Sequence, residues 1–245
     1  MTIELVEGDC VLGLLSSKRK KYDLVVTSPP YNAGKQYEND LSLQEYKRFA
    51  QQWLAVVSDR LSDNGSLWIN VGYTLLGKNQ ALPLTYLYYQ ASTLPLVQEI
   101  VWSYEGGLPY KKRFSHRTER WMWFAKKPAK ATFNLDEIRD ISLNKTKDCR
   151  NNPLGKNPAD CWYFDRVTNN ACEKTGHPCQ FPEEMIRRII LCCSNKGDSV
   201  LDPFMGSGTT GFVAKNNGRS FFGFEKDPSY FRIAKERIER VVSWA

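Results

Sequence analysis

The chain has 245 residues, of which 42% are hydrophobic, which is enough for one sizeable core or for one core with a modest insertion. Its formal net charge is +7, and no apolar run approaches the roughly 20 residues of a membrane-spanning helix. The first residues lack the charged-then-apolar pattern of a secretory signal, so we expect a cytoplasmic protein without a membrane partner.

Short apolar segments alternate with amphipathic stretches along the chain. Seven segments have the length and the β-branched or aromatic content of strands: 3–7, 24–27, 67–71, 99–103, 121–125, 199–201 and 221–224. Three apolar stripes recur at helical spacing and predict packing faces: Tyr46, Phe49, Trp53 and Val56; Met185, Ile186, Ile189 and Ile190; and Phe231, Ala234, Ile238 and Val241. The alternation predicts an α/β fold with a doubly wound, mostly parallel sheet covered on both faces.

A loop-rich insertion is expected between residues 129 and 170, where the periodicity fades into Asn, Lys, Pro and Asp. Positive charge gathers nearby, because residues 108–156 contain 13 Lys and Arg against five acidic residues. Such a region suits contacts with nucleic-acid phosphates, although a solvated lysine-rich surface would have the same composition. We expect a single domain over residues 1–245, with a basic, loop-rich region at about residues 108–170 inside it.

The seven cysteines are scattered without paired C-x-x-C spacing, and only two histidines accompany them. In a cytoplasmic protein this pattern favours reduced thiols. A zinc site would need tighter clusters of cysteine and histidine. We therefore expect no bound metal.

A glycine-rich turn follows the predicted strand 199–201 and precedes a stretch, 210–217, that can form a helix. In open α/β sheets ligands bind beyond the carboxyl ends of strands, at such turns. Gly206 and Gly208 would let the backbone approach a ligand without a Cβ clash. Residues 206–211 also match the G-x-G-x-x-G dinucleotide pattern, but the Asp-Pro-Phe lead-in and the lack of a second half count against a nicotinamide or flavin enzyme. No Lys follows the glycines, which excludes a P-loop.

Two carboxylates accompany this turn. Asp202 directly precedes it and suits a cationic ammonium group, such as that of S-adenosylmethionine, better than a pyrophosphate. Glu225 ends the next predicted strand and can accept hydrogen bonds from both hydroxyls of a ribose. Together they favour an S-adenosylmethionine site.

A second motif, Thr-Ser-Pro-Pro-Tyr-Asn at residues 27–32, follows a buried run and reaches the same edge of the predicted sheet. The exocyclic amino group of cytosine or adenine is a poor nucleophile, because its lone pair is delocalised into the ring. The Ser28 oxygen and the Pro29 carbonyl can accept hydrogen bonds from its two N–H groups, on a loop stiffened by Pro29 and Pro30. Tyr31 can stack on a base flipped out of the duplex. Alone, the segment could also be a proline-rich turn that ends a strand.

In this order, the two motifs resemble those of the β-class DNA amino methyltransferases, in which the catalytic motif precedes the cofactor motif. The resemblance implies the Rossmann-like class I methyltransferase fold and S-adenosylmethionine as cofactor. It implies catalytic roles for Ser28, Pro29, Pro30 and Tyr31, and cofactor contacts by Asp9, Phe181, Asp202, Pro203, Phe204, Gly206, Ser207, Gly208, Thr209 and Glu225. Asp9 falls where the family reads the adenine of the cofactor, and Phe181 lies in a stretch, 177–182, similar to the one that closes the methionine end of the pocket.

Pro178-Cys179-Gln180 resembles the nucleophile segment of a different class, the cytosine-C5 methyltransferases, in which a thiolate adds to the ring. Those enzymes place the cysteine after the cofactor motif and carry a later Glu-Asn-Val segment. Here Cys179 precedes the cofactor motif and no such segment follows. We interpret Cys179 as a small packing residue.

A serine before Pro-Pro is typical of N4-cytosine enzymes, so the resemblance favours cytosine over adenine, although adenine enzymes also use it. We expect the basic, loop-rich region at about residues 108–170 to recognise the DNA target. Within it, Lys111, Lys112, Arg113 and Arg117 are candidate contacts to the phosphates or bases of double-stranded DNA. The prediction is a bacterial- or phage-like DNA amino methyltransferase, monomeric or homodimeric. It would be an orphan methyltransferase or one half of a restriction–modification pair, with a restriction endonuclease that acts separately.

Two other functions are compatible with such a fold. A catalytically silent DNA-binding protein would be expected to lose the acceptors at Ser28 to Tyr31 or Asp202, and both are intact. A methyltransferase acting on RNA or on protein glutamine shares the Pro-Pro-Tyr chemistry but usually carries the cofactor motif first.

Overall fold

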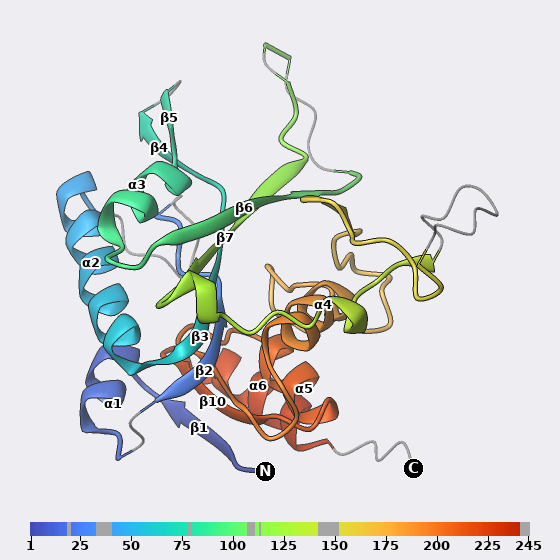
Figure 1. Ribbon diagram of the computed structural model, residues 1–245. Coiled ribbons are helices and arrows are strands. Elements are labelled where there is room, and N and C mark those ends of the chain that lie inside the picture. Colours follow the sequence, from blue (N-terminus) through green and yellow to red (C-terminus); the bar gives the residue numbers. More distant parts are fainter. Residues whose placement is uncertain are drawn as a thin grey trace.

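The computed structural model describes residues 1–18, 21–32, 41–77, 80–106, 111–112, 114–141 and 152–240 (Figure 1). Eight strands form one sheet in the order β1-β10-β9-β2-β3-β7-β6-β8. Their bounds are β1 Ile3–Glu7, β2 Tyr22–Thr27, β3 Leu61–Val71, β6 Leu96–Ser103, β7 Thr118–Ala125, β8 Cys161–Tyr163, β9 Ser199–Asp202 and β10 Ser220–Glu225. Neighbouring strands are parallel, except that β7 is antiparallel to both β3 and β6. This confirms the predicted doubly wound, mostly parallel sheet.

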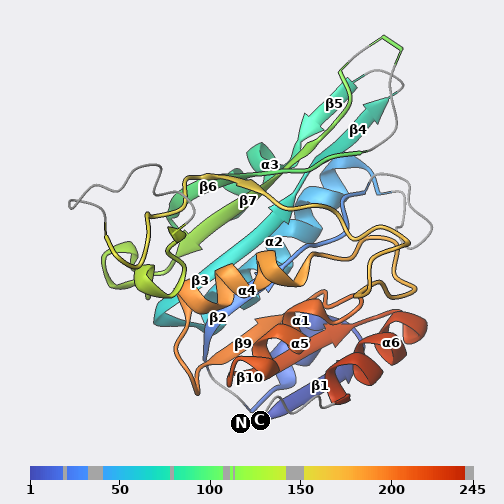
Figure 2. The same cartoon turned by 90° about the vertical axis from the view of Figure 1, so that its right-hand side faces the viewer.

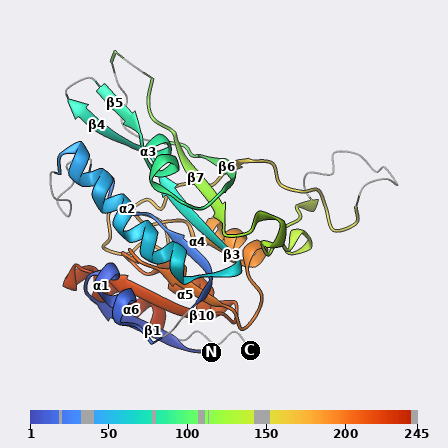
Figure 3. The ribbon, with the colours of Figure 1, turned by 60° about the vertical axis from the view of Figure 1, so that its left-hand side comes forward.

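Three helices cover each face of the sheet (Figures 1 and 3). On one face lie α1 Cys10–Ser16, α2 Leu43–Arg60 and α3 Leu84–Ala91; on the other lie α4 Glu183–Cys193, α5 Thr209–Asn216 and α6 Pro228–Glu239. Side chains of a strand alternate between the two faces. Val25 of β2 accordingly packs with α1 to α3, whereas Leu24 and Val26 pack with α4 to α6. Burial on both faces explains why β2 reads as a continuous apolar run.

Each of the seven predicted strands lies within an observed strand, and the three predicted stripes lie on α2, α4 and α6. Val241, the last residue of the third stripe, lies outside the described residues. The stripes are packing faces as predicted: Trp53, Ile189 and Ile238, for example, are fully buried. The sequence did not predict α1, α3, β8 or the two-stranded sheet of β4 (Tyr73–Gly77) and β5 (Gln80–Pro83). These elements are three to eight residues long, which is too short for a periodic signal.

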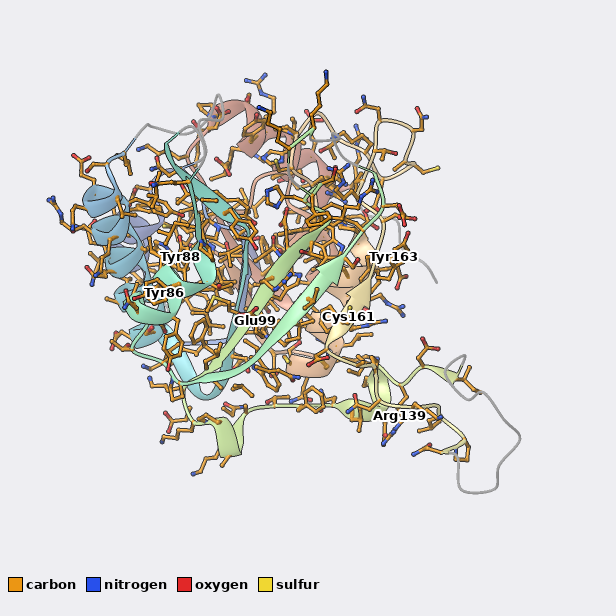
Figure 4. All side chains as sticks on the ribbon, turned by 90° about the horizontal axis from the view of Figure 1, so that it is seen from above. Tyr86, Tyr88, Glu99, Arg139, Cys161 and Tyr163 are labelled. Atoms are coloured by element: carbon orange, nitrogen blue, oxygen red, sulfur yellow. The ribbon has the colours of Figure 1, made fainter. Side chains whose placement is uncertain are left out.

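Two projections rise from the edge of the sheet where β3 ends and β7 begins. Figure 2 shows the β4–β5 hairpin and the segment that leads into β7 extending beyond that edge. The predicted insertion, in its described part, contains only two short 3-10 helices, Pro128–Lys130 and Leu135–Glu137, and the strand β8. Arg139 lies on an arm that extends away from the sheet, whereas Cys161 and Tyr163 lie on the edge strand β8 (Figure 4). The region 108–170 also includes β7, which lies inside the central sheet between β3 and β6.

Six cysteines lie in the part of the chain that the structure describes, and none of them is in a disulfide bond there, in agreement with the predicted reduced thiols; Cys149 lies outside that part. Within the same ranges, no helix is long and apolar enough to cross a membrane.

Candidate active site

The two predicted motifs meet because β2 and β9 are neighbouring parallel strands. Leu24 pairs with Val200 and Val25 with Leu201, so both strands end at the same edge. There the Thr27 hydroxyl donates a hydrogen bond of 2.7 Å to the Asp202 carboxylate. The end of β2, just before the predicted catalytic loop, is thus tied directly to the turn that is predicted to bind the cofactor.

Asp202 is an acid held away from water, with only 3% of its surface exposed. Its Oδ1 accepts hydrogen bonds from the Thr27 hydroxyl and from the backbone N–H of Phe204, at 3.1 Å. Burial outweighs these bonds and raises the pKa of Asp202 from 3.8 to about 6. A cationic ligand against this carboxylate would offset the cost of its buried charge.

The glycine-rich turn needs its glycines. Gly206 and Gly208 have φ values of 50° and 75°, in the left-handed region of backbone conformation that residues other than glycine rarely adopt. A Cβ at Gly208 would also lie 3.0 Å from the Cα of Ala234, and one at Gly206 would lie 3.1 Å from the His177 ring. The backbone of this turn is therefore close-packed from beneath by α6 and flanked by the stretch 177–182.

Arg237 of α6 is a residue near the turn that sequence reasoning missed. Its guanidinium donates to the Thr209 hydroxyl at 2.8 Å and forms an ion pair with Glu183 at 2.6 Å, with its side chain only 10% exposed. The hydroxyl of Ser207 lies 3.4 Å from the same guanidinium. The side chains of Ser207 and Thr209, both predicted cofactor contacts, thus have Arg237 as an observed partner.

Glu225 lies beside the turn at the end of β10. Its two oxygens accept the backbone N–H groups of Gly206 and Asp227, each at 2.9 Å. Burial raises the pKa of the Glu225 carboxyl. The backbone N–H of Gly8 donates to the Glu225 carbonyl, which brings the adjacent Asp9 to this side of the sheet.

Asp9 caps the first turn of α1. Its Oδ1 accepts the backbone N–H groups of Val11 and Leu12, at 2.9 and 3.1 Å, while its surface is exposed. A helix cap is a complete structural reason for an aspartate here. The other oxygen, Oδ2, has no hydrogen-bond partner among the described residues and remains available to a ligand.

The two predicted aromatic cofactor contacts lie on opposite sides of the sheet. Phe204 packs against Trp53 and Phe49 of α2, at ring-centroid distances of 5.3 and 5.9 Å. Phe181 packs against Trp121 of β7 at 5.1 Å, within the cluster under α4 to α6. Both rings are only partly buried. Pro203, the remaining member of the turn, is buried.

The predicted catalytic loop is fixed by hydrogen bonds on both of its sides. The buried Tyr46 of α2 donates its hydroxyl to the Pro30 carbonyl at 2.6 Å, so the Pro30 carbonyl already has a donor. Among the described residues the Pro29 carbonyl has no such partner. Asn32, which ends the motif, has φ 55° and pairs its side-chain amide with both backbone groups of Leu41. A left-handed asparagine is rare but tolerated, and here it closes the loop.

Ser28 and Tyr31 belong to one hydrogen-bonded network. The Ser28 hydroxyl lies 3.2 Å from the Tyr31 hydroxyl and 3.4 Å from the Asn70 carbonyl. The Tyr31 hydroxyl in turn lies 2.8 Å from Asn70 Oδ1 and 3.1 Å from Glu119 Oε2. Neither Asn70 of β3 nor Glu119 of β7 was predicted, because neither stands in a motif and only the pairing of β3 with β7 brings them together.

Cys179 is exposed, so the interpretation of it as a packing residue is wrong. Its backbone N–H donates to Nδ1 of His177 at 3.1 Å, which turns the stretch 177–182 sharply and leaves the thiol on the surface. The buried residues of this stretch are instead Pro182 and Gln180, and Gln180 accepts two hydrogen bonds from Thr175.

Three of the four candidate DNA contacts, Lys111, Lys112 and Arg117, lie on the projection before β7. Lys111 and Lys112 are exposed, whereas Arg117 forms a surface ion pair with Glu105 at 3.1 Å. Arg113 lies outside the described residues. Phe114, which no motif singled out, is 97% exposed beside these cations. An exposed aromatic ring among cations is typical of surfaces that contact nucleic-acid bases.

Comparisons with known proteins identify the family of this chain. The family model described as DNA methylase matches residues 22–236. The chain is 40% identical to the type II methyltransferase M.ScaI of Streptomyces caespitosus, over 96% of this chain and 81% of that protein. It is 32% identical to the DNA adenine methyltransferase YhdJ of Escherichia coli K12, over 96% of this chain and 82% of that protein. Among solved structures, the M1.HpyAVI complex with S-adenosylmethionine is similar, with a TM-score of 0.68, 25% identity and coverage of 97% of this chain and 100% of that one.

Proposed function

Because the chain belongs to the DNA methylase family of N4 and N6 amino methyltransferases, we propose that it methylates N4 of a cytosine flipped out of double-stranded DNA. The observation that carries the proposal is the junction of the two motifs, where Thr27 binds Asp202 at 2.7 Å. That bond fixes the loop proposed to accept hydrogen bonds from the target amino group beside a carboxylate suited to an ammonium group. A silent DNA-binding protein would have no need of either.

The cofactor is S-adenosylmethionine, and the residues at the end of β9 and β10 fit it. Buried Asp202 suits the ammonium group, and Glu225 keeps lone pairs for the ribose hydroxyls beyond those used by Gly206 and Asp227. The left-handed glycine turn offers backbone without Cβ atoms. When bound, S-adenosylmethionine supplies a methyl group activated by a sulfonium. Asp9 Oδ2 is the acceptor for the adenine amino group.

The chain's own contribution to the reaction is made by the loop after β2. Ser28 Oγ and the Pro29 carbonyl accept the two N–H bonds of the target amino group, which draws its lone pair out of conjugation with the ring. Preorganised acceptors of this kind are effective because they need no rearrangement during the reaction. The bond from Tyr46 to the Pro30 carbonyl and the left-handed Asn32 hold the loop in this geometry. Tyr31 stacks on the flipped base.

Ser28 supports cytosine as the target, because a serine at this position is typical of N4-cytosine enzymes. Adenine is the alternative, since YhdJ, a relative at 32% identity, is named a DNA adenine methyltransferase. Both bases present the same amino geometry to the loop and differ in the ring that must fit beside it. The resemblance to M.ScaI, a type II methyltransferase, supports a role opposite a restriction endonuclease that acts separately.

DNA binding is assigned to the projection before β7. Lys111, Lys112 and Arg117, with Arg113, supply phosphate contacts, which position the duplex over the carboxyl edge of the sheet. Phe114 is available for contact with a base step beside the flipped nucleotide.

The test is to express the protein in a bacterial host that lacks DNA methylation, digest the genomic DNA to nucleosides and identify the products by mass spectrometry. We expect N4-methyldeoxycytidine, and sequencing of the same DNA would give the recognition sequence. N6-methyldeoxyadenosine instead would transfer the proposal to adenine. Ser28→Ala, expressed at the same level, is the control. The proposal would be refuted if DNA from cells that express the wild-type protein contained no base methylated on its amino group.

A further inference from the structure

A serine hydroxyl can donate or accept a hydrogen bond, and only acceptance helps the proposed reaction. The target amino group has two N–H bonds to give and needs acceptors for both. A Ser28 hydroxyl that pointed its proton at the base would repel those N–H bonds. Something must therefore fix the direction of the Ser28 proton.

The surroundings of Ser28 draw its proton inward. The hydroxyl has two acceptors behind it, the Tyr31 oxygen at 3.2 Å and the Asn70 carbonyl at 3.4 Å. A hydroxyl has one proton and two lone pairs. With its proton on either inner acceptor, Ser28 keeps lone pairs for the base.

Tyr31 can serve as that acceptor only if its own proton points elsewhere. Its hydroxyl has two acceptors of its own, Asn70 Oδ1 at 2.8 Å and Glu119 Oε2 at 3.1 Å. Burial and the Glu119 charge hold the pKa of Tyr31 well above its ordinary range, so the hydroxyl stays protonated. The chain of bonds therefore runs from Ser28 to Tyr31 and then to Asn70 or Glu119.

Asn70 is a polar residue in an apolar place. It is fully buried in β3 between Ile69 and Val71, which are also fully buried. Its amide nitrogen donates to the Arg120 carbonyl of β7 at 3.4 Å, which turns its oxygen toward Tyr31. A buried amide costs free energy unless its hydrogen-bonding groups find partners, whereas a leucine at this position would need none. The side-chain oxygen of Asn70 and its backbone carbonyl contact Tyr31 and Ser28 of the loop after β2.

We propose that Asn70 and Glu119 are positioning residues that fix the Tyr31 hydroxyl and thereby hold Ser28 as a hydrogen-bond acceptor for the target amino group. This inference rests on the proposed amino methylation. The side chains of both residues act through the Tyr31 hydroxyl.

The first test compares Glu119→Leu with Glu119→Gln, which keeps an acceptor oxygen. Glu119 is only partly buried and lines a cavity of about 170 Å³ together with Glu99 and Gly72, so a leucine can be accommodated. Glu99→Leu is the matched control, because Glu99 lies on β6 beside the same cavity and pairs with Arg120 without contacting Tyr31 (Figure 4).

The measurement is the single-turnover methylation rate on the duplex that the wild-type protein modifies, with the dissociation constants of cofactor and DNA measured in parallel. We expect Glu119→Leu to lower the rate on the order of 10- to 100-fold, since small misplacements of reacting groups have effects of this size. Glu119→Gln should stay within a few-fold of the wild type, as should Glu99→Leu. Both dissociation constants should be unchanged.

A double-mutant cycle with Tyr31→Phe separates positioning from a general structural effect. If Glu119 acts through the Tyr31 hydroxyl, Glu119→Leu should lower the rate no further once that hydroxyl is removed. The same should hold for Asn70→Leu, with the exposed Asn64→Leu on the same strand as its control.

Additive losses in the cycle, or wild-type rates in Glu119→Leu, would overturn the inference, and so would a loss confined to binding or to the folded fraction. If Asn70→Leu does not fold, the Glu119 series decides alone. Absence of amino methylation by the wild-type protein would instead refute the proposed function, and this inference with it.

Discussion

Asp202→Asn should stabilise the cofactor-free protein while it weakens cofactor binding. Burial raises the pKa of Asp202 from an ordinary 3.8 to about 6 in the folded protein, so the folded state favours the protonated acid. At pH 7 the acid is ionised, and the difference between these pKa values corresponds to about 3 kcal/mol at 1.36 kcal/mol per pKa unit. Asparagine keeps an oxygen for Thr27 and for the Phe204 N–H but carries no charge to bury.

The pH dependence gives this prediction its sign and its internal control. The pKa of Asp202 is higher in the folded state than in the unfolded state. Protonated Asp202 therefore contributes to wild-type stability at low pH, and this contribution is lost as pH rises from about 4 through 6. Asp202→Asn has no such loss. Urea unfolding at pH 4 and at pH 7 should therefore show a variant advantage of up to about 3 kcal/mol at pH 7 that largely disappears at pH 4. Equal stability at pH 7, or an advantage that does not change with pH, would refute the reasoning.

Calorimetry on the same variant tests the functional half. Loss of a charge-assisted hydrogen bond costs about 1.5–3 kcal/mol, so S-adenosylmethionine should bind roughly 10- to 100-fold more weakly to Asp202→Asn at pH 7. In the wild type, affinity should fall as pH drops below about 6, because Asp202 becomes protonated. Wild-type affinity in the variant would mean that the ammonium group is held elsewhere.

Three further outcomes are expected. Replacing Lys111 and Lys112 by Glu should weaken duplex binding and lower the slope of log affinity against log salt by about 0.9 for each phosphate that is no longer neutralised, with cofactor affinity unchanged; a titration series in salt with an unchanged slope would reduce this surface to a solvated one. Cys179→Ser should retain most activity and a 5-fluorocytosine duplex should not trap the protein, because direct transfer needs no thiol; an inactive Cys179→Ser with covalent trapping would indicate a C5 mechanism. Gly208→Ala should destabilise the protein by more than Gly197→Ala does. Both positions have positive φ, which costs an alanine about 1–2 kcal/mol, but of the two only the Cβ at Gly208 would meet another backbone segment, at 3.0 Å from the Ala234 Cα. Equal unfolding free energies for the two variants would contradict the close packing of the turn.

The sequence predicted those parts of the site that lie within continuous motifs. Ser28 to Tyr31 and the turn after Asp202 could be placed at one edge because each follows a strand that is buried on both faces and so has an unmistakable composition. Residues that join the site across strands could not be predicted. Asn70 and Glu119 reach Tyr31 only through the antiparallel pairing of β3 with β7, and no local pattern specifies which strands pair.

Short elements and exposed thiols were the other gaps. Helix α1, with seven residues, and strand β8, with three, are too brief to repeat a period. Cys179 was wrongly interpreted as a packing residue after motif order had argued against a nucleophile, whereas the turn formed with His177 leaves it on the surface. Arg237 was missed for a different reason: an arginine in an amphipathic helix reads as solvent-facing, and only the tertiary structure brings it to Thr209 and Glu183.

The most direct test of direct methyl transfer to an amino group uses purified protein, duplex DNA and S-adenosylmethionine with a deuterated methyl group. Nucleosides released from the product are separated and fragmented in a mass spectrometer, which places the label on the ring carbon or on the exocyclic nitrogen. We predict the label on N4 of deoxycytidine, with turnover lowered far more than cofactor affinity in Ser28→Ala. Label on C5 of cytosine, or undiminished turnover in Ser28→Ala, would contradict transfer by the loop after β2.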